Sequence, residues 1–288
     1  MSNQVNTLDL KSFHYLENGE IGFSALDTIK TTNILDSGFY SLFYEGHPTY
    51  NVRVSLLVNK ESVKLHSFPD KEKLDNIFKM FFDNSIYQKI TNLGFYHKLG
   101  ILMYGKEGCG KSTILKYYCN QAIIKNGALV FYITQQDHDL THCWNFITNI
   151  RKIQNNPVIV VFEEMDVLVN RNLESLLKTI LDGNLSIDNC IFFATTNYIN
   201  QIPEALKNRP SRFKYSINIE GIHSEVDIYP IIEKMLKDKF SEEEFKEWSI
   251  ELKGSSLDEI KQFCIDKIMD IESYSRDRKR LGFSVVSN

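Results

Sequence analysis

The chain has 288 residues, of which 43% are hydrophobic, and a formal net charge of −4, so it can bury a sizeable core. No apolar run approaches the roughly 20 residues that span a bilayer, and the first residues lack the charged and apolar regions of a signal peptide. We therefore expect a soluble, cytoplasmic protein without a membrane partner. The five cysteines lack paired C-x-x-C spacing, which argues against a disulfide framework or a zinc site. The net charge gives no general attraction for nucleic acid, although a local basic patch could still bind it.

Residues 1–70 are expected to form a β-rich N-terminal region. Within them, residues 37–68 are rich in aromatic and β-branched side chains, and turn-forming residues interrupt this stretch at 46–48 and 59–61. This pattern predicts a small antiparallel sheet. Residues 71–90 follow with apolar side chains at helical spacing, which predicts a leading helix.

Strands and helices are expected to alternate from Gly100 onward. The expected strands are 101–104, 128–134, 158–162 and 190–197, and the expected helices between them are 112–125, 144–153 and 173–183. This order predicts an α/β fold with a parallel sheet and helices on both faces. We place this domain at residues 71–221, and ligands of such sheets bind at the carboxyl ends of the strands.

The C-terminal part is expected to be a small helical lid at residues 222–275, followed by a tail at 276–288. Three helical segments are expected, at 225–240, 241–252 and 255–274. Ser241 and Glu244 have the spacing of a capping box at the start of the second segment.

The sequence GKEGCGKS, residues 105–112, lies between the first strand and the first helix of the α/β domain. Gly105 and Gly110 bracket the spacing G-x-x-x-x-G-K-[ST], in which exposed backbone N–H groups and a helix N-terminus hold phosphate. Lys111 would reach the β and γ phosphates, and Ser112 would place its hydroxyl on a magnesium ion. The alternative is a glycine turn without a ligand. The expected nucleotide-binding residues are Gly105, Lys106, Glu107, Gly108, Cys109, Gly110, Lys111, Ser112 and Thr113.

Two acidic residues, Glu163 and Glu164, follow the apolar strand 158–162. Their position at a strand's carboxyl end predicts that they lie beside the phosphate loop. We assign Glu163, with Ser112, to magnesium, and we assign Glu164 to the attacking water. The alternative is an exposed strand end with ordinary acidic residues.

Asn197 and two arginines complete the candidate site. Asn197 follows the strand 190–197, where its amide could hydrogen-bond the γ phosphate or the attacking water. Arg209 and Arg212 flank Pro210, and a guanidinium suits the charge of a transferring phosphoryl group. Taken alone, the arginines are ordinary surface charges.

Five segments together resemble the AAA branch of the AAA+ ATPases, in order and spacing, over residues 98 to about 270. They are GILMYGKEGCGKS, VIVVFEEMD, LLKTILDG, FFATTNYINQIPEALKNRPSRF and ELKGSSLDEIKQFC. The resemblance implies a Walker A loop with catalytic Lys111, a Walker B strand at 158–164, Asn197 as sensor 1, and Arg209 and Arg212 as arginine fingers. Such fingers act on a neighbouring subunit's nucleotide. The resemblance therefore implies a homo-oligomeric ring, usually of six subunits, with ATP and Mg²⁺ between protomers.

Within this branch, residues 173–213 are most similar to the mitochondrial translocase of the Rieske iron-sulfur protein, and the layout resembles small phage-encoded AAA proteins. The chain departs from the family in three places. Position 163 is Glu where Asp is usual, and Leu257-Asp258 replaces a Gly-Ala pair in the lid. Residues 135–146 lack the aromatic-apolar-glycine pore loop and offer Trp144 without a neighbouring glycine.

For the cysteine and histidine residues near these motifs, structural roles are preferred over redox or metal-binding roles. Cys109 stands at a helix N-terminus, which can lower a thiol pKa, but a small side chain at a variable loop position is the preferred interpretation. His138, His142 and Cys143 have helix-compatible spacing for a metal, but a polar turn before a helix is preferred.

The resemblance implies Mg-dependent ATP hydrolysis coupled to remodelling of a protein or macromolecular complex, with the N-terminal region recruiting the protein client. Two alternatives remain. One is a loader or motor acting on DNA or a replication complex, and the other is a nucleotide-gated assembly scaffold with little hydrolysis.

Overall fold

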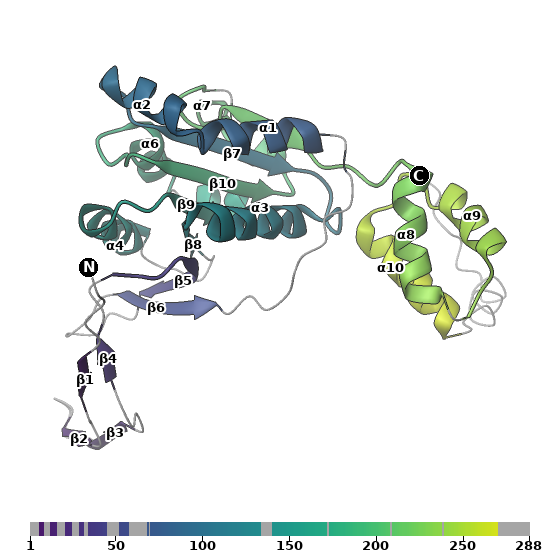
Figure 1. Ribbon diagram of the computed structural model, residues 1–288, viewed down its shortest axis with the longest axis horizontal. Helices are drawn as coiled ribbons and strands as arrows, with labels where there is room; N and C mark the ends of the chain where they lie inside the picture. Colours follow the sequence, from purple (N-terminus) through teal and green to yellow (C-terminus); the bar gives the residue numbers. More distant parts are fainter. Residues whose placement is uncertain are drawn as a thin grey trace.

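The computed structural model describes residues 6–8, 12–15, 21–24, 29–31, 34–44, 52–57, 68, 70–133, 140–171, 173–207, 209–237 and 239–269 (Figure 1). These residues form a main sheet covered by helices, two short strand pairs and a separate helical unit. The basic residues of the expected tail at 276–288 lie outside the described residues.

The main sheet contains seven strands among the described residues, in the order β11-β7-β10-β9-β8-β5-β6. Its centre consists of β7 (Lys98–Tyr104), β8 (Leu129–Ile133), β9 (Val158–Phe162) and β10 (Cys190–Thr196), and β11 (Tyr215–Asn218) forms one edge. These strands are parallel to one another. Every residue of β8, β9 and β10 is buried, as expected for parallel strands covered on both faces. The predicted α/β fold with a parallel sheet is therefore confirmed.

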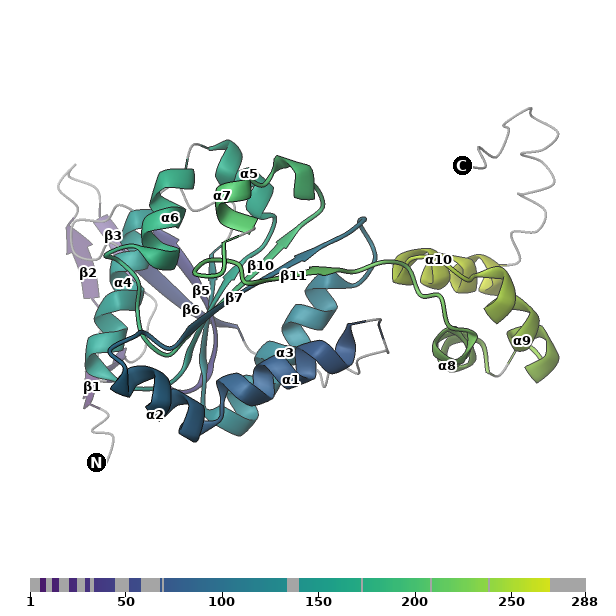
Figure 2. The same ribbon diagram turned by 90° about the horizontal axis from the view of Figure 1, so that it is seen from above.

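Helices cover the two faces of this sheet, which Figure 2 shows close to edge-on. On one face lie α1 (Lys71–Phe81) and α3 (Lys111–Asn126). On the other face lie α4 (Leu140–Ile153), α5 (Met165–Asn170), α6 (Glu174–Asp182) and the short α7 (Glu204–Lys207). The amphipathic helix α2 (Asn84–Asn92) follows α1, and η1 (Ile199–Gln201) follows β10.

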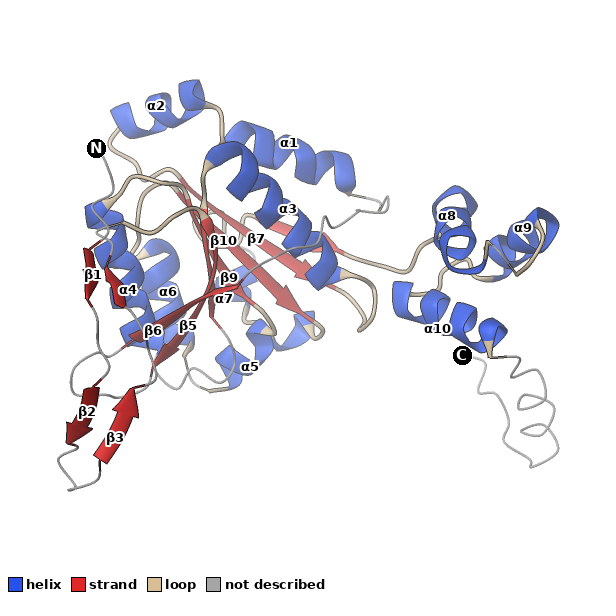
Figure 3. Cartoon of the chain, turned by 60° about the horizontal axis from the view of Figure 1, so that its bottom comes forward, coloured by secondary structure: helices blue, strands red, loops and turns tan. Residues whose placement is uncertain are grey.

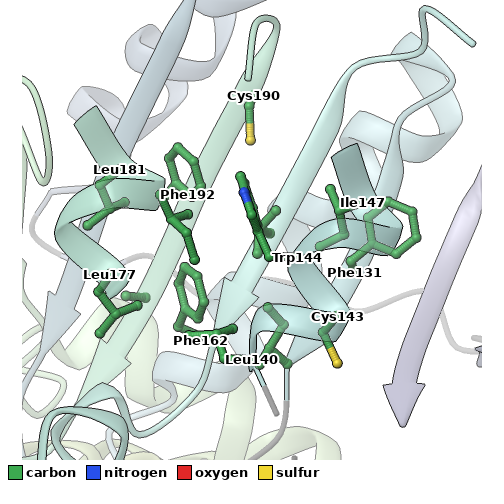
Figure 4. Packing of buried hydrophobic residues seen from close by; sticks show 14 of the residues in the cluster. Phe131, Leu140, Cys143, Trp144, Ile147, Phe162, Leu177, Leu181, Cys190 and Phe192 are labelled. Carbon is green, nitrogen blue, oxygen red and sulfur yellow. The ribbon is translucent and has the colours of Figure 1, made fainter. Parts of the chain in front are cut away.

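Trp144 lies in the centre of the core on the α4 face (Figure 4). Its side chain is 1% exposed, its ring centroid lies 5.9 Å from that of Phe192, and its Nε1–H donates to the carbonyl oxygen of Leu185 at 3.0 Å. A large apolar ring with a satisfied donor is a stable core element. Trp144 is therefore a packing residue and contributes no pore loop, and residues 134–139 lie outside the described residues.

The hairpin predicted within residues 37–68 is present but belongs to the main sheet. Strand β5 (Gly38–Tyr44) pairs antiparallel with β6 (Val52–Leu57) and in parallel with β8. Phe39 and Leu42 of β5 are buried in the cores on opposite faces of the sheet. The sequence predicts a boundary after residue 70, whereas the sheet continues across it, because the alternating pattern of β5 does not reveal which strand it pairs with.

Two other antiparallel pairs precede β5: β1 (Asn6–Leu8) with β4 (Ile29–Thr31), and β2 (Ser12–Tyr15) with β3 (Ile21–Ser24) (Figure 3). These pairs agree with the expected β-rich character of the N-terminal region. None of the described helices is both long and apolar enough to cross a membrane.

The C-terminal unit consists of α8 (Glu225–Leu236), α9 (Glu242–Glu251) and α10 (Leu257–Ile268), which lie beside the α/β domain in Figure 2. They enclose a core of their own, to which Trp248 belongs. The predicted capping box of Ser241 and Glu244 is present at the start of α9. Ser256 and Glu259 form a second capping box, which begins α10 next to the α/β domain.

We expect Leu42→Ala to lower the free energy of unfolding by about 2–5 kcal/mol, because removal of a fully buried leucine side chain leaves a cavity. Leu42 is 0% exposed. The change should appear as an earlier midpoint of the main transition in urea, followed by circular dichroism. Ile124→Ala is the control, because Ile124 is 77% exposed on α3. An unchanged midpoint in Leu42→Ala would mean that β5 does not unfold together with the main sheet.

Candidate functional site

The loop between β7 and α3 has the backbone of a phosphate-binding loop. Gly110, the N-cap of α3, has φ 90° and ψ 15°, a left-handed conformation that favours glycine. Gly105 has φ 152°, and a Cβ there would lie 2.0 Å from the carbonyl oxygen of Ile219. Backbone N–H groups of this loop and the N-terminus of α3 are together suited to bind anionic oxygen atoms.

Lys111 is the first residue of α3 and is 8% exposed. Its Nζ donates hydrogen bonds of 2.7 Å to the carbonyl oxygens of Gly105 and Lys106. Burial lowers the pKa of Lys111, and nearby acidic groups, including Glu107, Asp166 and Glu164, oppose that shift. The ammonium group is thus held at the phosphate loop by hydrogen bonds and by surrounding negative charge.

Glu163 and Glu164 leave the carboxyl end of β9 in different environments. The side chain of Glu163 is half-buried, and its Oε1 is buried without a hydrogen-bond partner in the part of the chain that the structure describes. Glu164 is exposed and has φ 51° and ψ 54°, an unusual conformation for a residue with a side chain, which costs on the order of 1–3 kcal/mol. Its backbone N–H donates to Thr195 Oγ1 at 3.3 Å. Backbone strain at an acidic residue that follows a strand is typical of functional sites.

Asn197 follows β10 and connects the third strand end to the phosphate loop. Its Nδ2 donates to Glu107 Oε1 at 3.4 Å. The preceding residue, Thr196, is buried and donates from Oγ1 to the carboxylate of Asp166. The sequence motifs predict no role for Asp166, which is 6% exposed. The feature of the sequence that could have revealed it is an acidic residue directly beside Met165, within the mostly apolar segment that forms α5.

A cavity of about 540 Å³ brings these strand ends together. Its lining residues are Glu107, Gly108, Gly110, Lys111, Ser112, Thr113, Tyr132, Ile133, Glu163, Glu164, Thr195, Asn197, Leu257 and Asp258. The lining thus contains most of the residues predicted from the phosphate loop and both predicted carboxylates. Tyr132, Ile133 and Thr195 were not predicted, because their presence depends on which strands are neighbours in the sheet.

Three residues of the predicted loop set do not line the cavity: Gly105, Lys106 and Cys109. Burial raises the pKa of the Cys109 thiol, with Lys111 opposing the shift. This is the opposite of the lowered pKa that a helix N-terminus can produce. Cys109 is half-buried and packs against the core under α3, so it is a packing residue of the loop. Among the described residues, no group of three or more potential ligands is arranged to hold a metal by itself. His142 and Cys143 lie inside α4 and not in the expected turn before it, and His138 lies outside the described residues.

The lid contributes one wall of the cavity. Leu257 and Asp258, at the start of α10, line it, and the backbone N–H of Asp258 donates to the carbonyl oxygen of Gly108 at 3.3 Å. A Cβ at Gly108 would lie 3.1 Å from the Cβ of Asp258. The phosphate loop and the lid are therefore in direct contact.

Arg209 and Arg212 lie away from this cavity, between α7 and β11. Both pair with Asp182 at the end of α6: Asp182 Oδ2 lies 3.3 Å from Arg209 Nε and 3.0 Å from Arg212 Nε. The Arg209 side chain is 57% exposed, whereas that of Arg212 is 7% exposed. Arg212 also donates from Nη1 to the carbonyl oxygen of Ala205 at 2.6 Å. The two predicted finger residues therefore differ, since only Arg209 has a largely exposed side chain.

A known protein family matches the part of the chain that contains β7, the phosphate loop and α3. Residues 101–220 match the model of the family described as ATPase family associated with various cellular activities (AAA). Residues 101–220 form an AAA ATPase domain. This domain contains the phosphate loop, both glutamates, Asn197 and the two arginines. The family match is evidence for nucleotide binding and for ATPase activity in general.

The residues at the loop and at the end of β9 fit a magnesium ion. Ser112 and Glu163 both line the cavity. Their hydroxyl and carboxylate oxygens are hard ligands, and magnesium is bound through one or two carboxylates together with waters and substrate phosphates. Glu163 and Ser112 are thus the groups that would hold it.

Asp182→Ala should lower the free energy of unfolding by about 3 kcal/mol, because it leaves the buried guanidinium of Arg212 without its charge partner. Arg209→Ala, the control, removes an exposed partner and should cost less than about 1 kcal/mol. Chemical denaturation at neutral pH measures both. Equal losses in the two variants would contradict this division.

The same pair predicts a pH dependence. Burial would raise the pKa of Asp182, but hydrogen bonds from Ser211 and Arg212 and the two arginine charges outweigh it and lower the pKa. A lowered carboxylate pKa stabilises the fold fully above the unfolded-state pKa of about 3.9. Part of the wild-type stability is therefore lost below about pH 4, and Asp182→Ala should lack that part.

Proposed function

We propose that this protein hydrolyses ATP in an oligomeric AAA ring and uses the hydrolysis to remodel a protein or a macromolecular complex. The observation that carries the proposal is the convergence of Lys111, Glu163, Glu164 and Asn197 on one cavity at the carboxyl edge of the sheet. A phosphate loop alone could hold a nucleotide. The added carboxylates and amide supply groups that hydrolysis needs.

The loop residues bind and orient the triphosphate. Backbone N–H groups between Gly105 and Lys111 would donate to phosphate oxygens, and Lys111 Nζ would exchange its two carbonyl partners for the β and γ phosphates. Ser112 and Glu163 would hold Mg²⁺, which when bound supplies positive charge against the phosphates. Asp166 is positioned by Thr196 and lies close enough to affect the pKa of Lys111.

Glu164 and Asn197 act on the attacking water. Glu164 would accept a proton from this water as its oxygen attacks the γ phosphorus and ADP leaves, and the Asn197 amide would hold the water in line. Glu164 follows the end of β9 with a left-handed backbone. Its exposed side chain lines the cavity, where a water could reach it. Asn197 would then have to give up its contact with Glu107.

The exposed position of Arg209 is an argument for an assembly of several subunits. Its side chain is exposed and does not line the cavity of its own subunit, so a catalytic role requires the nucleotide of a neighbour. Arg212 is held inside its own subunit by Asp182 and Ala205. We propose that Arg209 is the finger that reaches the neighbour, and that Arg212 acts chiefly by holding the segment that presents it.

Two contacts would connect hydrolysis to remodelling. The hydrogen bond from Asp258 to Gly108 joins the phosphate loop to the lid, so a nucleotide that reshapes the loop would move the lid. The pairing of β5 with β8 joins the N-terminal strands to the catalytic sheet. We propose that the N-terminal region recruits a protein client.

The scaffold alternative is favoured by one observation, the engagement of Arg212 within its own subunit, which leaves Arg209 as the exposed arginine of the pair. A scaffold would retain ATP through purification and release almost no phosphate. A hydrolysing ring would release phosphate at a rate per subunit that rises as assemblies form.

Lys111→Ala should abolish ATP binding, because it removes the ammonium group from the loop. Glu164→Gln should keep ATP bound and slow hydrolysis by about 100-fold or more, because an amide cannot accept the proton. Binding of a fluorescent ATP analogue and phosphate release, measured on the same samples, check both. Hydrolysis at the wild-type rate in Glu164→Gln would exclude Glu164 as the general base.

A mixture of Glu164→Gln and Arg209→Ala subunits should hydrolyse ATP faster than either variant alone. In the mixture, an Arg209→Ala subunit retains its own Glu164 and receives Arg209 from a Glu164→Gln neighbour. Phosphate release should be measured against the mixing ratio, and mass photometry of the same samples reports the assemblies. A rate equal to the average of the two variants at every ratio would mean that each subunit acts alone.

A further inference from the structure

Two buried polar atoms at the cavity have no hydrogen-bond partner in the part of the chain that the structure describes: the hydroxyl oxygen of Tyr132 and Oε1 of Glu163. Tyr132 is 7% exposed. Both residues line the cavity of the candidate site. Buried polar groups are rarely left unpaired, so each such group calls for an explanation.

The strand register places these two side chains on the same face of the sheet. Tyr132 of β8 lies opposite Val161 of β9, and Glu163 comes two residues after Val161. Glu163 is the first residue after β9, and its charge acts on Cys119 of α3, so it lies on the side of the sheet that α3 covers. Tyr132 and Val161 both belong to the core under α3. The phenol and the carboxylate therefore approach the phosphate loop from neighbouring strands and on the same side.

The hydroxyl of Tyr132 is a hydrogen-bond donor throughout the physiological range. Burial raises its pKa above the ordinary value, and the nearby carboxylate of Glu163 raises it further. A protonated phenol can donate to a carboxylate. Lys111, the ammonium group of the cavity lining, is already bound to Gly105 and Lys106.

A glutamate needs a second contact if its carboxylate is to be held in one orientation. Its side chain has one more rotatable bond than that of an aspartate, and its terminal torsion is broad. Groups behind a metal-binding carboxylate orient it by hydrogen bonding. Oε1 of Glu163 is buried without a partner, and the Tyr132 hydroxyl is the other buried, unpartnered polar atom among the described lining residues of the cavity.

We propose that Tyr132 is a positioning residue for the metal site: its hydroxyl donates to Oε1 of Glu163, directly or through one water, when the magnesium nucleotide is bound. The other carboxylate oxygen is then directed toward the metal and its waters. This inference rests on the proposed function, because it assigns Tyr132 to the same site.

The test is Tyr132→Phe in the full chain, which removes the hydroxyl and little else. Mn²⁺ is titrated into protein saturated with the non-hydrolysable analogue AMP-PNP, and the free ion is followed by electron paramagnetic resonance. We expect the Kd for Mn²⁺ to rise about tenfold, as is typical when a group supporting a metal ligand is lost. AMP-PNP affinity without metal should stay within about twofold of wild type.

The variant is expected to fold, because the hydroxyl it removes is unpaired in the described structure and its loss leaves no partner unsatisfied. Its melting temperature without nucleotide should equal or exceed that of wild type. Tyr40→Phe is the matched control, since Tyr40 is also buried in the sheet but its hydroxyl donates to the carbonyl oxygen of Asp36 at 2.6 Å. This control should leave the Kd for Mn²⁺ unchanged.

The same substitution in a Glu163→Ala background separates a positioning role from a direct one. If Tyr132 acts through Glu163, Tyr132→Phe should have no further effect on Mn²⁺ affinity in that background. A full tenfold effect there would mean that the hydroxyl contacts the metal nucleotide itself and would overturn the proposal, as would an unchanged Kd in the single variant. Failure of wild type to bind AMP-PNP would instead overturn the proposed function together with this inference.

Discussion

Backbone hydrogen bonds between β10 and its parallel neighbours β7 and β9 determine where each part of the candidate site begins. Tyr104 lies opposite Thr196, and Phe162 lies opposite Ala194. The phosphate loop therefore starts beside Asn197, and the first glutamate leaves its strand beside Thr195. A slip of one residue would turn each side chain to the other face of the sheet. The strand register thus decides whether the loop, the carboxylates and the amide share one cavity.

The charge of this cavity is a second constraint. Carboxylates of Glu107, Glu163, Glu164 and Asp258 belong to its lining, against the single ammonium group of Lys111 among the described lining residues. Such a cavity would repel a bare polyphosphate, although the N-terminus of α3 reduces the repulsion. A divalent cation would compensate the excess negative charge. The composition of the lining therefore favours a metal-bound nucleotide over a free one.

Local patterns in the sequence predict the parts of the site that depend on neighbouring residues. The phosphate loop, the two glutamates after β9 and Asn197 after β10 could be assigned because each follows an apolar strand directly. Pairings between distant segments could not be assigned in this way. The buried Asp182–Arg212 pair joins α6 to the segment before β11, and Tyr132 reaches the cavity only because β8 is the neighbour of β9. The position of Trp144 in the core likewise depends on packing against Phe192, which lies 48 residues later in the chain.

The parallel pairing of β5 with β8 limits how the α/β domain can be separated from the rest of the chain. All five residues of β8 are buried, and β5 occupies the hydrogen-bonding edge that β8 would otherwise present to solvent. A chain beginning at residue 71 would expose that apolar edge, which is the kind of surface on which strands of other molecules add and aggregate. The smallest soluble fragment that contains the α/β domain should therefore begin before Gly38, because β5 covers the edge of β8.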